Sequence, residues 1–205
     1  MEHLLEQKLS ILSVVEDTTV DGPGFRTAIY GAGCSHHCLG CHNPQSWELN
    51  NGTLMSVGEL LQIVLADEFA DVTFTGGDPF FQVEGFAALA KAIKQNSSKT
   101  IWCYTGYTIE QLMANPRFMP LLSLIDVLVD GPFIEALRTE EFLFRGSSNQ
   151  RILKVKDIFF SSISILCLPM VERRFFRMVS KVEFENHSPN VAMTKRVVAS
   201  PPILY

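Results

Sequence analysis

Residues 25–41 read FRTAIYGAGCSHHCLGC, an apolar run that ends in glycines and then in three closely spaced cysteines. The start of this stretch is rich in β-branched and aromatic residues, a composition that predicts a β-strand. Further short apolar runs follow downstream, separated by segments with helical spacing; they cover residues 72–75, 100–104, 125–130 and 152–155. This alternation is typical of βαβ units, in which crossover helices join parallel strands.

The helical segments carry their own start signals. Ser56 followed by Glu59 has the pattern of a capping box, and an apolar helical stretch comes directly after it. We predict two further helices, over residues 83–94 and 109–113. Five strands are too few to close an eight-stranded barrel. The sequence therefore predicts an α/β fold, either an open parallel sheet or a partial, open parallel β/α barrel.

Glycine-rich turns follow four of the predicted strands, at residues 31–34, 76–79, 105–106 and 130–132. In both architectures, ligands bind at the carboxyl ends of parallel strands. We therefore expect these turns and the cysteine cluster to meet at one rim, which would be the active site.

Composition restricts the class of protein. The 205 residues are 47% hydrophobic and 19% charged, which excludes a disordered chain and favours one folded domain, with or without an appendage. A net charge of -5 argues against nucleic acid as a partner, because phosphate backbones are held by basic surfaces.

The two ends of the chain differ. Residues 1–8 lack the basic start and apolar core of a signal peptide. The longest apolar stretch, residues 158–171, is shorter than the roughly 20 residues that span a bilayer. These features predict a cytoplasmic protein with no membrane partner. All 13 glycines lie before residue 147. Because the chemistry should lie with them, we divide the chain into a domain over 1–156 and an extension of unknown role over 157–205.

The cysteine cluster has the spacing C-x3-C-x2-C, formed by Cys34, Cys38 and Cys41. An odd total of five cysteines and no export signal point to metal or thiol chemistry instead of disulfides. One candidate is structural zinc, with a neighbouring histidine (His36, His37 or His42) as fourth ligand. Zinc ligands usually come as two separated pairs, however. Three thiolates on one loop suit an iron–sulfur cube better, and they leave one iron open for a reactant.

The cysteine spacing, together with the Gly-Gly-acid-Pro turn at residues 76–79, resembles the radical S-adenosylmethionine (SAM) enzymes. The flanking segments at residues 21–26 and 41–47 resemble those of the glycyl-radical-enzyme activases within that family.

Three further features narrow the resemblance: Gly40 before the third cysteine and the segments at residues 129–133 and 145–151. They are similar to the activating proteins of anaerobic ribonucleoside-triphosphate reductases, and the resemblance covers about residues 9–156. It implies a partial barrel of the radical SAM type, with the active site at the C-terminal ends of the strands.

The resemblance implies an oxidoreductase that cleaves SAM at a [4Fe-4S] cluster and abstracts hydrogen from a glycine of the reductase, leaving a glycyl radical. It implies cluster ligation by Cys34, Cys38 and Cys41, and it places Asp21 near the partner's glycine loop. It implies a low-potential electron donor such as flavodoxin. The open alternatives are an activase of another glycyl-radical enzyme, a small radical SAM biosynthetic enzyme, and a zinc-binding interaction module.

The residues expected at the SAM site are Gly40, Gly76, Gly77, Asp78, Pro79, Thr105, Asp130, Ser147, Asn149 and Arg151. Related activases have Glu at the position of Asp78, so the substitution retains a carboxylate group there. Asp130 either caps a turn or helps to hold a monovalent cation near the SAM carboxylate. The loop histidines His36 and His37 are expected to face solvent, and the alternative is that they donate hydrogen bonds to cluster sulfur. We expect the remaining cysteines, Cys103 and Cys167, to pack in the core.

Overall fold

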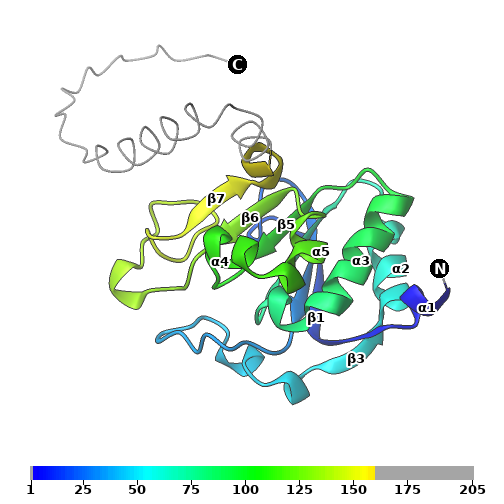
Figure 1. Ribbon diagram of the computed structural model, residues 1–205, viewed down its shortest axis with the longest axis horizontal. Helices are drawn as coiled ribbons and strands as arrows, with labels where there is room; N and C mark the ends of the chain where they lie inside the picture. The colour runs from blue at the N-terminus through cyan, green and yellow to red at the C-terminus, as the bar shows by residue number, and fades with distance from the viewer. Residues whose placement is uncertain (1, 160–205) are drawn as a thin grey trace, which may run out of the picture. The chain divides into compact units, whose positions relative to one another are not determined.

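The computed structural model describes residues 2–159, which fold around a seven-stranded sheet (Figure 1). The strands are β1 (Lys8–Thr18), β2 (Arg26–Gly31), β3 (Thr53–Ser56), β4 (Asp71–Gly76), β5 (Ile101–Tyr104), β6 (Val127–Asp130) and β7 (Arg151–Lys154). The α-helices are α1 (Glu2–Leu5), α2 (Val57–Ala66), α3 (Val83–Asn96), α4 (Ile109–Ala114) and α5 (Met119–Leu122). Residues 155–159 are also helical.

The sheet order is β3-β1-β2-β4-β5-β6-β7, and its ends do not pair with each other. The central strands β2, β4, β5 and β6 run parallel, whereas β1, β3 and β7 join antiparallel. The predicted α/β class and open sheet are confirmed. The predicted count of five strands was wrong, because β1 and β3 were missed. The last predicted strand is present, but it pairs antiparallel with β6.

The predicted helix starts are correct. Ser56 accepts a hydrogen bond from the backbone N–H of Glu59, and the Glu59 carboxylate accepts one from the backbone N–H of Ser56. This capping box satisfies amide donors that the first turn of α2 would otherwise leave unpaired. The helices α3 and α4 begin at the predicted residues, Val83 and Ile109.

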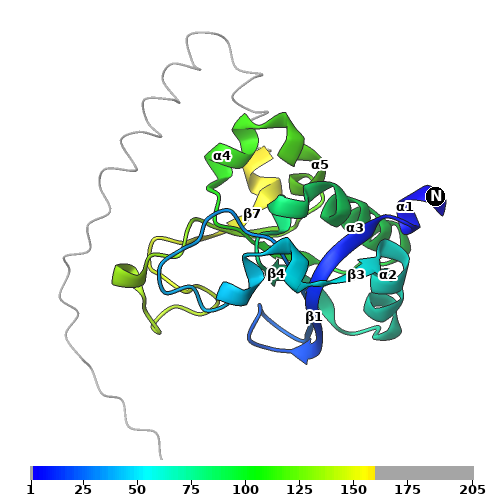
Figure 2. The same cartoon turned by 90° about the horizontal axis from the view of Figure 1, so that it is seen from below.

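One face of the sheet is the apolar core. A row of paired residues, Ile29, Phe74, Cys103 and Leu128, crosses the four parallel strands in register, and all four are fully buried. The helices α2, α3 and α5 lie side by side along the sheet (Figure 2), and their buried residues belong to the same hydrophobic cluster. This packing fixes the strands and therefore the loops at their ends.

The next row of residues along the strands is more polar. Thr73 and Trp102 are neighbours on β4 and β5, and the guanidinium of Arg26 hydrogen-bonds the first and lies over the ring of the second. Arg26 is 1% exposed, and it also donates to the backbone oxygens of Val72 and Pro23. Burial lowers the pKa of Arg26, and Asp71 opposes that shift.

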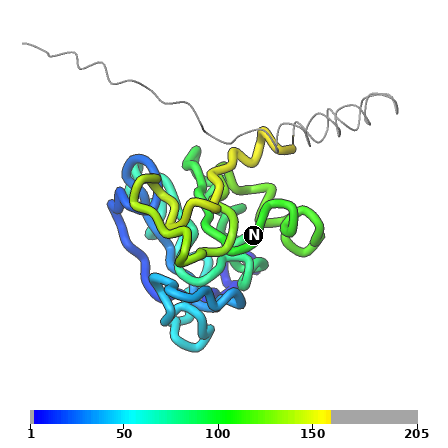
Figure 3. Tube along the Cα trace, turned by 90° about the vertical axis from the view of Figure 1, so that its left-hand side faces the viewer, coloured from blue at the N-terminus to red at the C-terminus, as the bar shows by residue number. Residues whose placement is uncertain are grey.

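The segments that follow β2 and β6, residues 32–52 and 131–150, lie at the same side of the molecule (Figure 3). Among residues 2–159, no helix combines the length and the hydropathy that crossing a bilayer requires. The predicted extension, apart from residues 157–159, lies outside the described residues, and so does Cys167.

Cys103 is core, as expected, and burial raises the pKa of its thiol. We predict that Cys103→Ala lowers the free energy of unfolding by about 1 kcal/mol, because it deletes one buried sulfur atom. Urea denaturation of the purified protein measures this loss, and iron content should match that of the unmutated protein. A variant that loses iron would contradict the assignment of Cys103 to the core.

Candidate active site

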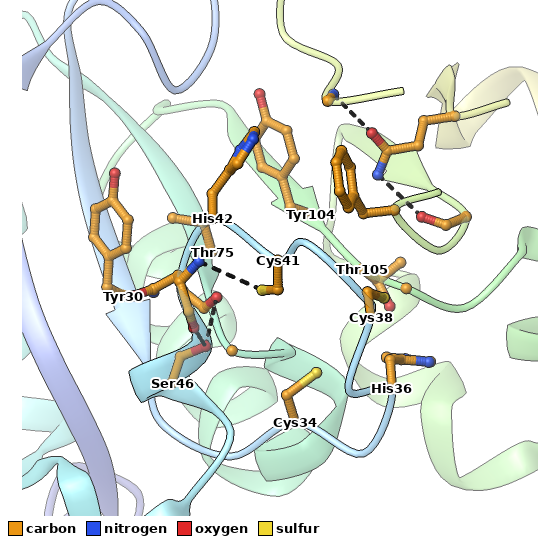
Figure 4. Close-up of a pocket in the computed structure, with 18 of the residues that line it drawn as sticks. Tyr30, Cys34, His36, Cys38, Cys41, His42, Ser46, Thr75, Tyr104 and Thr105 are labelled. Atoms are coloured by element: carbon orange, nitrogen blue, oxygen red, sulfur yellow. Dashed lines mark hydrogen bonds between the residues drawn. The ribbon is translucent and has the colours of Figure 1, made fainter. Parts of the chain in front are cut away.

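A cavity of about 370 Å³ opens where the four parallel strands end, a size within the range of small-molecule sites (Figure 4). The segments that directly follow β2, β4, β5 and β6, called strand exits below, all contribute to the wall of the cavity. The lining includes Cys34, Cys38 and Cys41 after β2, Gly76 and Gly77 after β4, Thr105 and Gly106 after β5, and Gly131 and Phe133 after β6. The expected meeting of these turns at one rim is therefore confirmed.

Backbone hydrogen bonds tie the start of the cysteine loop, residues 34–41, to the chain that follows the loop. At its start, Gly33 and Cys34 donate to the carbonyls of Ser46 and Trp47, which lie on the returning chain. Near its end, Gly40 has a φ of +71°, and a Cβ there would lie 2.8 Å from the Glu135 carboxyl group. Glycine at position 40 therefore lets the loop turn against the segment after β6, although Gly40 itself does not line the cavity in the described structure.

The three thiols are free and half-buried. Burial raises the pKa of the Cys34 thiol to about 11, so a metal that binds there displaces its proton. The backbone N–H of Asn43 points at the Cys41 sulfur from 3.4 Å, a donor that would stabilise a bound thiolate.

The donor set fits a cluster better than a single ion. Among residues 2–159, no group of three or more His, Cys, Asp or Glu side chains converges closely enough to hold one metal ion. Zinc requires all its ligands at about 2.0–2.3 Å from one point. Three thiols on the wall of one cavity match a multi-iron cluster, whose irons are ligated at separate corners.

The glycine turn after β4 packs directly against the backbone that leaves β2. A Cβ at Gly76 would lie 2.6 Å from Gly31 N, and one at Gly77 would lie 2.4 Å from Gly33 O. Gly77 N–H donates to Gly31 O, and the Ser46 hydroxyl donates to Gly76 O. The two glycines thus allow the close approach of two strand exits, and both line the cavity.

Asp78 lies behind the cavity wall instead of in it. Its carboxylate is 3% exposed and accepts hydrogen bonds from Phe80 N, Thr105 Oγ1, Gly106 N and His36 Nε2. Neither Asp78 nor Pro79, the first residue of the 3-10 helix η3 (Pro79–Gln82), lines the cavity in the described part of the chain. Thr105 does line it, and Asp78 fixes its hydroxyl.

One end of the cavity, at Asp21, carries two phenols and a carboxylate. Asp21 accepts a hydrogen bond from the Tyr30 hydroxyl at 2.8 Å and another from Thr18 at 2.8 Å. Burial raises the pKa of Tyr30, and the hydrogen bond to Asp21 adds to the shift. Burial also raises the pKa of Tyr104, the other phenol in the lining. This end therefore holds neutral hydroxyl groups beside one acceptor.

Asp130 is paired within the protein. Arg151 donates to both of its carboxylate oxygens, at 2.9 and 2.5 Å, and Ile109 N–H donates to one of them. Arg151 also binds Glu110, which lowers the pKa of that carboxyl group to about 2. The guanidinium thus supplies the positive charge that a monovalent cation would bring, which was one of the two roles considered for Asp130. Within the described residues, neither Asp130 nor Arg151 lines the cavity.

The segment at residues 145–151 reaches the cavity through residues other than those predicted. The Ser147 hydroxyl is fully buried and accepts from Ile134 N–H, while Asn149 donates to Pro132 O. Both hold the segment together without lining the cavity in the described structure. Gly146 and Gln150 line it, and the Gln150 amide ties Gly131 to Gly146.

Several lining residues were not among those predicted for the SAM site: Tyr30, His42, Asn43, Ser46, Thr75, Tyr104, Phe133 and Gln150. Tyr30 and Thr75 are register partners near the ends of their strands, and Tyr104 ends β5. Side chains alternate between the two faces of a strand, which places these three on the face opposite the apolar core. Their position in the cavity wall could therefore have been predicted from this two-residue period. The loop residues lie within the segments at 41–47, 129–133 and 145–151 that carry the family resemblance, but the resemblance did not single them out.

Comparisons with known proteins agree with this site. A family model described as a 4Fe-4S single cluster domain matches residues 20–153. The chain is 36% identical over 140 residues to the anaerobic ribonucleoside-triphosphate reductase-activating protein of Salmonella typhi, which covers 64% of this chain and 89% of that protein. It is 35% identical over 144 residues to the protein of that name from Enterobacteria phage T4, covering 67% and 89%.

A third relative of the same name, from Haemophilus influenzae, is 31% identical over 158 residues, which covers 72% of this chain and 99% of that protein. The residues that the family model matches contain the cysteine loop and all four strand exits. The chain belongs to the family of anaerobic ribonucleoside-triphosphate reductase-activating proteins, whose 4Fe-4S domain it carries.

Proposed function

We propose that this protein is the activating enzyme of an anaerobic ribonucleoside-triphosphate reductase and that it installs a glycyl radical on that partner. The observation that carries the proposal is the set of three free thiols, Cys34, Cys38 and Cys41, on the wall of one cavity. The names of the relatives and the 4Fe-4S family model support it.

In this proposal, the three thiols hold a [4Fe-4S] cluster and the rest of the cavity binds SAM. When bound and reduced, such a cluster supplies one electron to SAM, which gives methionine and a 5′-deoxyadenosyl radical that can take a hydrogen atom from glycine. The chain's own contribution is binding and orientation. Asn43 N–H donates to the Cys41 sulfur, Thr105 presents a fixed hydroxyl, and the turn at Gly76 and Gly77 would place backbone groups against the methionine part of SAM.

The end of the cavity at Asp21 is proposed to receive the partner's glycine loop. Tyr30 holds the Asp21 carboxylate in place, and Tyr104 lines the same end. A carboxylate and neutral phenols can hydrogen-bond the backbone amides of an extended peptide. Such contacts would hold a glycine Cα near the reacting carbon.

The open sheet is proposed to be a partial barrel of the radical SAM type. The cavity lies at the carboxyl ends of the parallel strands β2, β4, β5 and β6, and this supports the proposal. We also propose an activase domain over residues 1–156 with an extension over 157–205, a low-potential electron donor such as flavodoxin, and a cytoplasmic location. Nucleic acid is not a proposed partner.

The proposal is tested by mixing the anaerobically reconstituted protein with the reductase, SAM and dithionite. Electron paramagnetic resonance (EPR) should show a glycyl doublet, because the abstracted hydrogen leaves a radical on the partner. A reductase whose acceptor glycine is replaced by alanine is the matched control and should give no doublet. Rapid SAM cleavage without a doublet on the unmutated reductase would indicate that the protein activates another glycyl-radical enzyme or catalyses a biosynthetic reaction.

A further inference from the structure

Two neighbouring side chains of the cysteine loop reach other strand exits through hydrogen bonds: Ser35, whose hydroxyl lies 3.4 Å from that of Tyr107, and His36, which makes the shorter contact. Its Nε2 lies 2.8 Å from the Asp78 Oδ2, and the side chain is only 17% exposed. An ionised carboxylate only accepts, so the imidazole N–H donates. The expectation that this histidine faces solvent was wrong, whereas His37 beside it is exposed as expected.

The Asp78 carboxylate is a rigid anchor. It receives Phe80 N–H from its own turn, and Thr105 Oγ1 and Gly106 N–H from the exit of β5. Asp78 N–H in turn donates to Gly33 O, at the start of the cysteine loop. A carboxylate with this many partners cannot shift without breaking several hydrogen bonds, and a buried one cannot replace them with water.

The imidazole also fits a shaped slot. A Cβ at Gly106 would lie 2.4 Å from the His36 ring, so the ring occupies the space that any other residue at 106 would fill. Tyr107 closes the slot with an edge-to-face contact at 4.5 Å between ring centroids. His36, which lies midway between Cys34 and Cys38 in the sequence, is therefore fixed by both packing and hydrogen bonding.

We propose that His36 is a positioning residue, which holds the cysteine loop in its cluster-binding conformation by linking it to Asp78 and to the exit of β5. The inference rests on the proposed function only in that the loop binds a cluster. Without the link, the loop would keep the backbone hydrogen bond between Gly33 and Ser46 and the long, exposed contact of Ser35 with Tyr107, but lose its shorter and more buried side-chain hydrogen bond.

Two amide substitutions at position 36 show whether the hydrogen bond to Asp78 requires the imidazole itself or only a donor at the same distance from the backbone. The amide nitrogen of glutamine reaches about as far as the imidazole Nε2, whereas that of asparagine stops nearer the Nδ1 position. We expect His36→Asn to release iron to a chelator about 10–100-fold faster than the unmutated protein, by analogy with the loss of metal affinity when a residue that supports a ligand is replaced. His36→Gln should stay within about threefold, well below that range. His37→Asn is the matched control, because asparagine tolerates its positive φ of 46°.

A second readout needs no cluster. Amide hydrogen exchange of residues 34–41 in the iron-free protein should be faster in His36→Asn than in His36→Gln or His37→Asn. Equal iron release and equal exchange in the two His36 variants would overturn the inference, as would slow iron release in both. If the unmutated protein binds no iron and sulfide at all, the proposed function fails instead, and the exchange experiment still decides the role of His36.

Discussion

Cys38→Ala is expected to abolish reductive SAM cleavage by this protein. Cys38 lies in the middle of the cysteine loop and lines the cavity, and the proposed cluster has three thiol ligands for four irons. Loss of one thiolate leaves a second iron without a protein ligand, so the cluster should be incomplete or absent. Because outer contacts alone cost 10–100-fold, we expect a loss of more than about 100-fold. The measurement is 5′-deoxyadenosine formed from SAM and dithionite.

Cys103→Ala is the matched control for this experiment. It makes the same substitution at a thiol that is fully buried in the core and absent from the described cavity lining. This variant should form 5′-deoxyadenosine at nearly the unmutated rate. Retained cleavage in Cys38→Ala, or equal losses in both variants, would contradict the assignment of Cys38 as a ligand.

Gly77→Ala is expected to have the second largest effect, on folding and on the site together. The new Cβ would lie 2.4 Å from Gly33 O and 2.9 Å from Ser46 O. Both are backbone atoms held by hydrogen bonds, so no flexible side chain can move aside. The exits of β2 and β4 must separate, and we expect the free energy of unfolding to fall by about 3 kcal/mol, the upper range for overpacking.

Gly58→Ala provides the comparison for this loss. It lies in the first turn of α2, where the nearest atom to an added Cβ is 3.4 Å away. Alanine should raise stability there by up to about 1 kcal/mol, since it is the better helix former. Urea unfolding of both variants, with iron content measured in parallel, checks the pair. An unfolding midpoint for Gly77→Ala equal to that of the unmutated protein would show that the two strand exits are not in contact.

The parallel part of the fold was predictable because its signals are local. Residues 56–59 specify the capping box, and each buried strand is a short apolar run. The strand β1 was missed because its alternation is interrupted. Its pairing with β2 shifts register between Ile11 and Ser13 and again between Val15 and Thr18, so apolar residues do not recur every second position. The strand β3 is short and has no fully buried residue, and only its pairing with β1 defines it.

The site was predictable as far as backbone position determines it. The cysteine loop and the glycine turns follow strands whose order could be inferred, so their meeting at one rim could be predicted. The partners of Asp78 and Asp130 could not. The carboxylate of Asp78 pairs with His36, which lies 42 residues away, and that of Asp130 with Arg151, which lies 21 residues away. Such pairings depend on tertiary packing, which residue types alone do not encode.

The account depends above all on a four-iron cluster that has one corner free for SAM. Anaerobic reconstitution should give four irons and four sulfides per chain, in line with three thiol ligands and one open iron. The most direct measurement is the EPR spectrum of the dithionite-reduced protein before and after SAM is added. We predict the signal of a reduced cubane cluster whose g-values shift when SAM binds. A spectrum that SAM leaves unchanged, or a protein that retains zinc in place of iron and sulfide, would contradict the account.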